Sequence, residues 1–163
     1  MKLFIHNKNE NIMLQTILAI SGKPGLYKLV SRGKNNLIVE ALDETKRRLP
    51  AFATDRITSL ADIAMFTDTD DVPLYKVLVN LRELEGGKAS SVNYKKATAD
   101  ELREYFGKVL PNFDRERVHN SDIKKLIQWY DILVANGITE FEKDMQPTEG
   151  DNIDNRADKM SEE

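Results

Sequence analysis

Few residues of this chain have the types and spacings that catalysis requires. The 163 residues include two histidines and no cysteine, which excludes disulfides, thiolate catalysis, iron–sulfur clusters and cysteine-ligated zinc. His6 lies near the N-terminus and His119 precedes a predicted helix, and neither belongs to a triad or a metal-binding spacing. We therefore expect no catalytic residue, no metal and no cofactor, and a protein that is not an enzyme.

The segment Gly22-Lys-Pro-Gly25 superficially resembles a phosphate-binding loop, because glycine allows close backbone approach and lysine supplies charge. A Walker loop reads G-x-x-x-x-G-K-[ST] and lies after a strand and before a helix. Here the predicted order is reversed, and Pro24 removes an N–H donor. We expect a turn that leads from a short helix into a strand.

The acidic run Asp68-Thr-Asp-Asp71 could suggest calcium, which prefers several oxygen ligands. It lacks the central glycine and the length of an EF-hand loop. We expect these acids to cap the helix that follows, because carboxylates stabilise a helix N-terminus.

Basic residues are concentrated in the first third of the chain. Residues 13–60 hold eight basic and four acidic residues, a net charge of +4. Such residues can track the phosphates of single-stranded nucleic acid while aromatic side chains stack on bases. A solvated strand surface is the alternative that we favour, since Tyr27 and Phe52 are the aromatics in this span and either can belong to the core.

Trp129 is the one tryptophan of the chain and follows the apolar pattern of a predicted helix. It can anchor an interface or pack between two parts of the chain, which we favour. The candidate binding surface consists of Lys23, Tyr27, Arg32, Lys34, Lys46, Arg47, Arg48 and Trp129.

The net charge of −3 conceals an uneven distribution. Residues 144–163 carry seven acidic and two basic residues, so the rest of the chain has a net charge of +2. This tail is polar and aperiodic, and we expect it to be disordered.

The pattern of the first half predicts a short helix followed by antiparallel strands. Apolar residues after Met13 fall at helical spacing. Leu26 to Arg32 and Leu37 to Leu42 form a predicted hairpin around the turn at 33–36. Pro50 marks the segment 47–53 as an edge strand or a bulge.

A short capped turn begins at Thr58 and Ser59, and Ile63 to Thr67 can follow it as a last strand. This arrangement suggests a small SH3-like barrel. The alternative is one helix from Leu60 to Phe66, because short apolar runs are ambiguous by period.

The second half reads as helices. Apolar residues from Leu74 to Leu84 have helical spacing, and Gly86-Gly87 ends the pattern. A capping box at residues 98–101 opens the next helix, which Pro111 stops, and a third begins at Asn120 or Ser121. We expect these last two to form a helical hairpin.

The predicted fold class is α+β, with a small antiparallel β domain, a closing helix and a C-terminal helical hairpin. We hypothesise a natural start at Met13, which makes residues 1–12 an upstream leader that is not native. The predicted divisions after it are a β-rich domain at 13–86, a linker at 87–97, a hairpin domain at 98–143 and a disordered acidic tail at 144–163. We expect no secretion signal, no membrane contact and a cytoplasmic location, because the apolar runs near the N-terminus are short and interrupted.

Several motifs together resemble a known family. They are the run from Leu18 to Leu29, Ile38-Val-Glu40, Phe52-Ala53, Ser59-Leu60-x-Asp62-Ile63, Asp114-Arg-Glu-Arg-Val118, Ser121-Asp122 and Trp129-Tyr130. In these the chain resembles small Bacteroidetes proteins that are classed as a domain of unknown function, with an N-terminal β domain and a helical C-terminal domain. The resemblance covers about residues 13–139 and implies a cytoplasmic bacterial setting, but no activity and no functional residue.

The function that we expect is a non-enzymatic binding or adaptor module, with a protein as partner. The alternative is a nucleic-acid-associated module that uses the basic hairpin surface.

Overall fold

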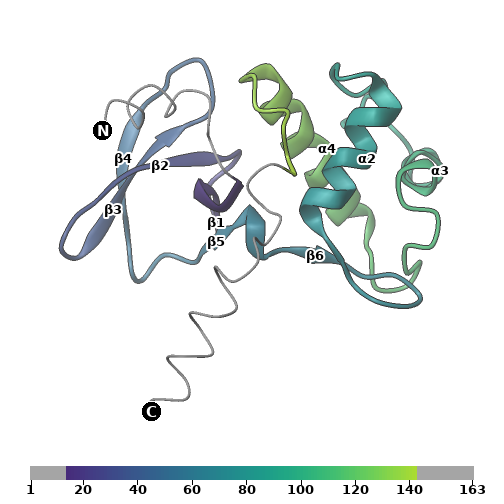
Figure 1. Ribbon diagram of the computed structural model, residues 1–163, viewed down its shortest axis with the longest axis horizontal. Coiled ribbons are helices and arrows are strands. Elements are labelled where there is room, and N and C mark those ends of the chain that lie inside the picture. The colour runs from purple at the N-terminus through teal and green to yellow at the C-terminus, as the bar shows by residue number, and fades with distance from the viewer. Residues whose placement is uncertain (1–13, 143–163) are drawn as a thin grey trace, which may run out of the picture.

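A computed structural model describes residues 14–142. The predicted leader, the start at Met13 and the acidic tail lie outside the described residues. The elements are η1 Leu14–Thr16, β1 Ile17–Ile20, β2 Tyr27–Arg32, β3 Asn36–Ala41, β4 Arg48–Phe52, β5 Ile57–Ser59, η2 Leu60–Asp62, β6 Ala64–Met65, β7 Val72–Pro73, α2 Leu74–Glu85, α3 Ala99–Val109 and α4 Asn120–Ala135. Figure 1 shows the strands β1 to β5 on one side and the helices, with β6 beside them, on the other, which confirms the α+β class.

The strands form a five-stranded antiparallel sheet in the order β4-β3-β2-β1-β5. The predicted hairpin is confirmed as β2 and β3, with Tyr27 opposite Ala41 and Arg32 opposite Leu37. Pro50 lies in β4 at the edge of the sheet, as expected for a residue that has no N–H to donate.

The prediction of a helix after Met13 is wrong. Only a 3-10 turn forms there, and β1 follows as a strand inside the sheet. Its sequence Ile-Leu-Ala-Ile lacks the apolar–polar alternation of a half-buried strand. The strand lies between β2 and β5, and side chains on both of its faces are largely buried. The turn Gly22-Lys-Pro-Gly25 therefore connects two strands, and not a helix and a strand as predicted.

The sheet is open in the part of the chain that the structure describes, because β4 and β5 form its two edges and do not pair with each other. Ser59 caps the 3-10 turn η2, and its hydroxyl accepts a hydrogen bond from the N–H of Ala61 at 3.1 Å. The strand β6 follows and pairs with β7 instead of joining the larger sheet. The alternative of one helix over 60–66 is wrong.

The helical half contains three packed helices. Gly86 ends α2 in a left-handed conformation with φ of 67°. The capping box at the start of α3 is confirmed: Thr98 accepts from the N–H of Glu101 at 3.1 Å, and Glu101 accepts from the N–H of Thr98 at 2.9 Å. His119 caps α4 through its N–H, which donates to Asp122 at 2.9 Å. The predicted hairpin of α3 and α4 is present, with α2 packed beside α3.

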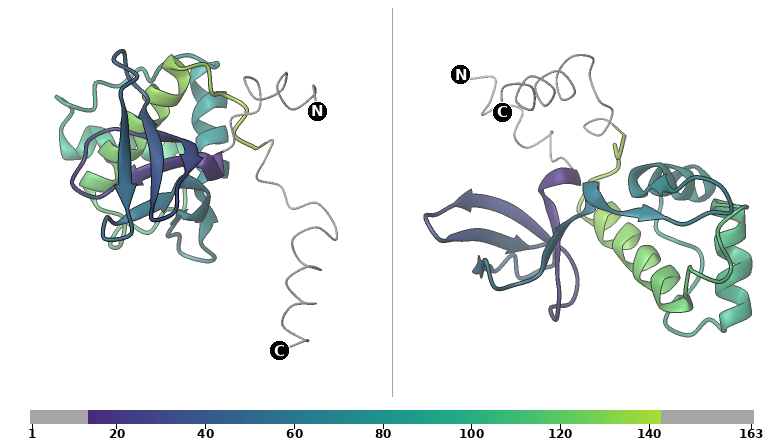
Figure 2. Two further views of the ribbon diagram at one scale, coloured as in Figure 1. Left: turned by 90° about the vertical axis from the view of Figure 1, so that its left-hand side faces the viewer. Right: turned by 90° about the horizontal axis from the view of Figure 1, so that it is seen from below.

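One hydrophobic cluster joins the sheet to the helices. Its sheet-side members include Ile17, Leu26 and Leu42, and it continues into all three helices through buried leucines, isoleucines and aromatic residues. The amide of Asn136, just after α4, also donates to the carbonyl of Leu42 at 3.5 Å. Figure 2 shows the β1 and β5 side of the sheet next to the helices, whereas β2, β3 and β4 extend away. The division predicted at residues 87–97 stays a prediction.

We expect the variant Leu26→Ala to lose about 2–5 kcal/mol of unfolding free energy, because the side chain is 2% exposed and its loss leaves a cavity. Urea unfolding followed by circular dichroism measures the change. Leu84→Ala is the control, since Leu84 is 43% exposed and should change stability by less than about 0.5 kcal/mol. Equal effects of the two substitutions would contradict a core shared by the sheet and the helices.

Candidate functional site: the groove beside Trp129

The predicted basic residues do not gather in one patch. Arg32 and Lys34 lie at one end of β3, in and after β2, and Lys46 and Arg47 lie in the turn at its other end. A strand of six residues separates the two pairs by roughly 20 Å. A single compact ligand therefore does not contact both ends of the hairpin.

Two more of the predicted residues have structural roles. Tyr27 is 8% exposed and belongs to the smaller hydrophobic cluster of the sheet. Arg48 pairs with Glu40 across the strands, with an Nε–Oε1 distance of 3.1 Å, and Lys28 approaches the same carboxylate at 3.9 Å. Tyr27 is thus not placed to stack on a ligand, and Arg48 is placed to stabilise the sheet.

The structure brings Lys23 and Trp129 together. Both line a groove of about 550 Å³ between the sheet and α4. Its lining residues are Ala19, Ile20, Ser21, Gly22, Lys23, Pro24, Gly25, Arg56, Thr58, Ile63, Lys125, Gln128 and Trp129. Three cations, Lys23, Arg56 and Lys125, line this hollow, and no carboxylate lies among the described residues that line it. We call it the basic half of the Trp129 groove, whose other half is described next.

A second hollow, of about 240 Å³, adjoins the first. Its lining residues are Ile63, Ala64, Met65, Phe66, Leu74, Val118, Asp122, Lys125, Leu126 and Trp129. We call it the apolar half. Ile63, Lys125 and Trp129 line both hollows, so the two hollows are adjacent, and we refer to them together as the Trp129 groove.

Local geometry explains why these residues meet. Lys125 and Trp129 are four residues apart in α4 and so lie on one face of the helix. The turn that carries Lys23 has glycines at φ of 85° and 76°, a conformation that favours glycine. A Cβ on Gly25 would lie 3.9 Å from the side chain of Ile132, so the turn packs closely against α4.

The three cations of the basic half are available to a ligand. Lys23, Arg56 and Lys125 are exposed, and none takes part in an ion pair within residues 14–142. Asp122 lines the apolar half, but its carboxylate accepts the N–H of His119 and so serves the helix cap. The groove is therefore electropositive beside an apolar hollow.

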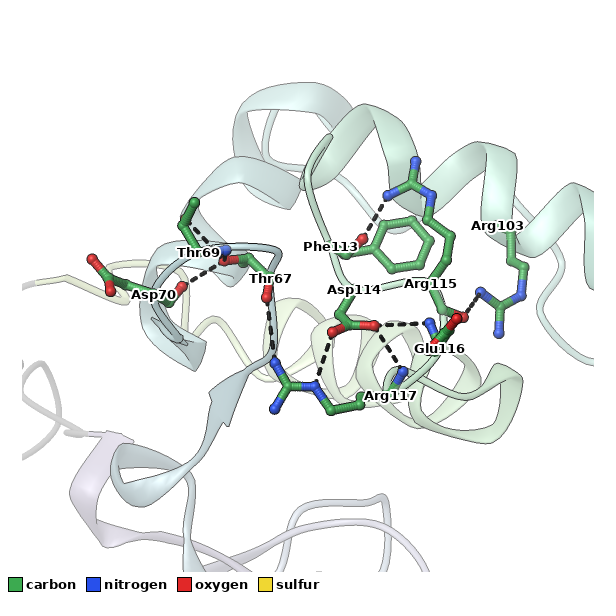
Figure 3. Close-up of polar contacts among 9 residues, drawn as sticks. All are labelled: Thr67, Thr69, Asp70, Arg103, Phe113, Asp114, Arg115, Glu116 and Arg117. Carbon is green, nitrogen blue, oxygen red and sulfur yellow. Dashed lines mark hydrogen bonds and ion pairs between the residues drawn. The ribbon is translucent and has the colours of Figure 1, made fainter.

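The segment before α4 supports the apolar half. The guanidinium of Arg117 donates to Asp114 at 2.9 Å and reaches the carbonyl of Thr67 at 3.4 Å (Figure 3). The same guanidinium stacks over the ring of Phe66, which lines the apolar half, at 4.2 Å. Thr67 is buried and organises its own loop, since its hydroxyl donates to the carbonyl of Asp70 at 2.6 Å. These contacts fix Phe66 at the edge of the groove.

The prediction that the acidic run after Thr67 caps α2 is wrong. The N-cap residue of α2 is Pro73, which makes no side-chain cap bond, and the strand β7 separates the run from the helix. Asp68 instead accepts the side-chain amide of Asn112 at 3.0 Å. No cluster of three possible metal ligands occurs within residues 14–142.

Side-chain hydrogen bonds elsewhere hold the segment 86–97 in place. Tyr105 and Ser91 both donate to the carboxylate of Glu85, and Ser90 donates to Asp131 at 2.9 Å. Desolvation acts against the charged form of Glu85, but the hydrogen bonds from Tyr105 and Ser91 lower its pKa. Burial, with the nearby Glu85, raises the pKa of Tyr105. No histidine lies in this network, and its contacts are those of a structural clamp.

The C-terminal end of the described chain is clamped to α2. Arg82 forms two parallel bonds of 3.0 Å to Glu142 and donates to the carbonyl of Thr139 at 2.6 Å. The hydrogen bond from Arg82 lowers the pKa of Glu142. No helix within residues 14–142 combines the length and apolar character that crossing a bilayer requires.

Sequence reasoning missed several groove residues. Arg56 is one of the eight basic residues within 13–60, but neither it nor Lys125, Met65 or Phe66 belongs to the predicted binding surface. Nothing in the sequence places β5, β6 and α4 side by side, so these residues become neighbours only in the fold. The spacing of Lys125 and Trp129 on one helix face was the signal available.

Comparison with known proteins identifies the family. Two family models match, a domain of unknown function (DUF5606) over residues 14–60 and a domain of unknown function (DUF6852) over residues 63–133. The chain is also similar to a protein from Bacteroides vulgatus whose solution NMR structure is known. The two share 65% sequence identity with a TM-score of 0.67, and the match covers 79% of this chain and 91% of that one. The chain belongs to this two-part DUF5606–DUF6852 family. The resemblance found in the sequence is confirmed, and the two family models meet at η2. No curated protein matches the chain.

We expect Asp114→Asn to lower the melting temperature at pH 7. Donation from the backbone N–H and guanidinium of Arg117 lowers the pKa of Asp114 from 3.8 to about 2. A carboxylate with a lowered pKa in the folded state stabilises above its unfolded pKa and loses this contribution as the pH falls through the folded value. The difference between the wild-type protein and the variant should therefore shrink from about pH 4 to pH 2.

Glu116→Gln is the control, because Glu116 is an exposed acid in the same loop. Its melting temperature should follow that of the wild-type protein. A difference between wild type and Asp114→Asn that stays constant down to pH 2, by thermal scans at each pH, would refute the role of the Asp114 carboxylate.

Proposed function

We propose that this protein is a non-enzymatic binding module that holds a segment of another protein in the Trp129 groove. The observation that carries the proposal is the junction at Trp129, where a cationic hollow and an apolar hollow share three lining residues. A polypeptide can carry an acidic side chain for the cationic hollow next to an apolar side chain for the other. A partly buried tryptophan is a common anchor of contacts between proteins. A cytoplasmic location is part of the proposal, supported by the absence of cysteine from the sequence.

The nucleic-acid alternative has less support. Its stacking residue would be Tyr27, which is buried, and its basic residues lie at opposite ends of the hairpin. Single-stranded nucleic acid needs a continuous cationic track with exposed aromatic platforms. Phe52 is 46% exposed beside one hairpin end, but no described cation cluster continues from it to the groove.

An SH3-like topology of the sheet is also a proposal. It is supported by five short antiparallel strands in the order β4-β3-β2-β1-β5. Such sheets commonly present binding surfaces at their turns, and the turn at 22–25 is the part of the sheet that lines the groove.

We expect Lys125→Glu to abolish capture of the partner. Lys125 lines both halves of the groove, and the reversed charge should repel the ligand that the cations attract. The measurement is chemical cross-linking in extract of the source cells, with and without nuclease treatment, followed by mass spectrometry. Lys124→Glu is the matched control, because Lys124 is an exposed neighbour on α4 that does not line the groove.

Support requires a protein that the wild-type chain and Lys124→Glu capture and that Lys125→Glu does not. Equal capture by all three would show that the groove is not the binding surface. A signal that disappears on nuclease treatment would favour the nucleic-acid alternative.

A further inference from the structure

We propose that the ligand of the Trp129 groove is an acidic protein segment in which one bulky apolar side chain lies beside carboxylates. The inference rests on the proposed function and specifies the chemistry of the partner. It is carried by the charge and shape of the two halves of the groove.

The basic half selects for negative charge. Lys23 from the β1–β2 turn, Arg56 next to β5 and Lys125 from α4 line it together, and no described carboxylate does. Exposed cations of one sign raise the rate of encounter with an anionic partner and disfavour cationic ones. Because the three cations are exposed, their effect on binding should weaken with salt.

The apolar half selects for one hydrophobic side chain. Met65 and Leu126 are 8% and 2% exposed and contribute to its walls, and the exposed ring of Phe66 forms its edge. Its volume of about 240 Å³ suits one aliphatic or aromatic side chain and not a folded domain. An aliphatic side chain fills this half with apolar contacts alone, whereas a nucleic-acid base also buries polar edges, which is costly without hydrogen-bond partners, so this half favours protein over nucleic acid.

The two halves constrain the spacing within the ligand. Lys125, Ile63 and Trp129 belong to both, so a side chain in the apolar half lies close to a group that is bound beside Lys125. The carboxylates must therefore lie within a few residues of the apolar anchor. A segment in which aspartate or glutamate flanks isoleucine or leucine meets this requirement.

The test uses a synthetic peptide, acetyl-Ser-Glu-Asp-Ile-Asp-Glu-Ser-amide, and the full chain. Trp129 is the only tryptophan among the 163 residues, so its emission reports on the groove without a label. We expect a saturable change in emission with the peptide, and an affinity that falls by about tenfold when isoleucine is replaced by serine. Replacing the four acids by their amides should weaken binding by at least about tenfold as well.

Variants of the protein locate the binding. Lys125→Glu and Lys23→Glu should each lower the affinity for the peptide by about tenfold. Lys124→Glu and Lys34→Glu change charge outside the groove, and their affinity should stay within about twofold of the wild-type value. Circular dichroism melting curves confirm that each variant is folded before it is compared.

Three results would overturn the inference: equal affinity for the serine peptide, equal affinity of Lys125→Glu and Lys124→Glu, or stronger binding of an oligothymidylate that displaces the peptide. If the acidic peptides do not bind but the cross-linked partner depends on Lys125, the ligand chemistry is wrong and the binding module stands. If neither result appears, both proposals fail.

Discussion

The structure depends on the packing of α4 against two neighbours, the helices α2 and α3 on one side and the sheet on the other. Ile123, Ile127 and Leu133 of this helix are fully buried in the cluster that also contains α2 and α3. The same cluster extends to Leu26 and Leu42, which flank the strands β2 and β3, and the turn at Gly25 approaches Ile132. Because α4 has apolar contacts on both sides, its position fixes the sheet relative to the helices and creates the groove along its remaining face.

The sequence predicted best where local chemistry decides the structure. The β2–β3 hairpin, the edge position of Pro50, the capping box at Thr98 and the glycine after α2 all follow from backbone preferences of a few adjacent residues. It failed at β1, whose apolar run has no distinguishing period and whose strand form is stabilised by β2 and β5 from elsewhere in the chain. The prediction of a closed barrel was wrong for a similar reason, since β6 pairs with β7 and not with the larger sheet.

Candidate site residues were harder to predict than elements. Lys23 and Trp129 were singled out separately, one for a glycine-rich turn and one for being the lone tryptophan, and their proximity comes from the packing of the sheet against α4. Charge counting along the chain grouped Lys23 with Lys34 and Arg47, which are near in sequence but lie on different turns. Linear clusters of charge indicate a patch only where the fold also brings them together.

The two family models meet at η2, yet the groove takes residues from both sides of that point: Lys23 and Arg56 from the first part, Lys125 and Trp129 from the second. Neither part contains the complete groove. Any ligand that fills it contacts the sheet and the helices at once, and so is thermodynamically linked to their association. Substitutions at the contact between the two parts can therefore change ligand affinity without touching the ligand.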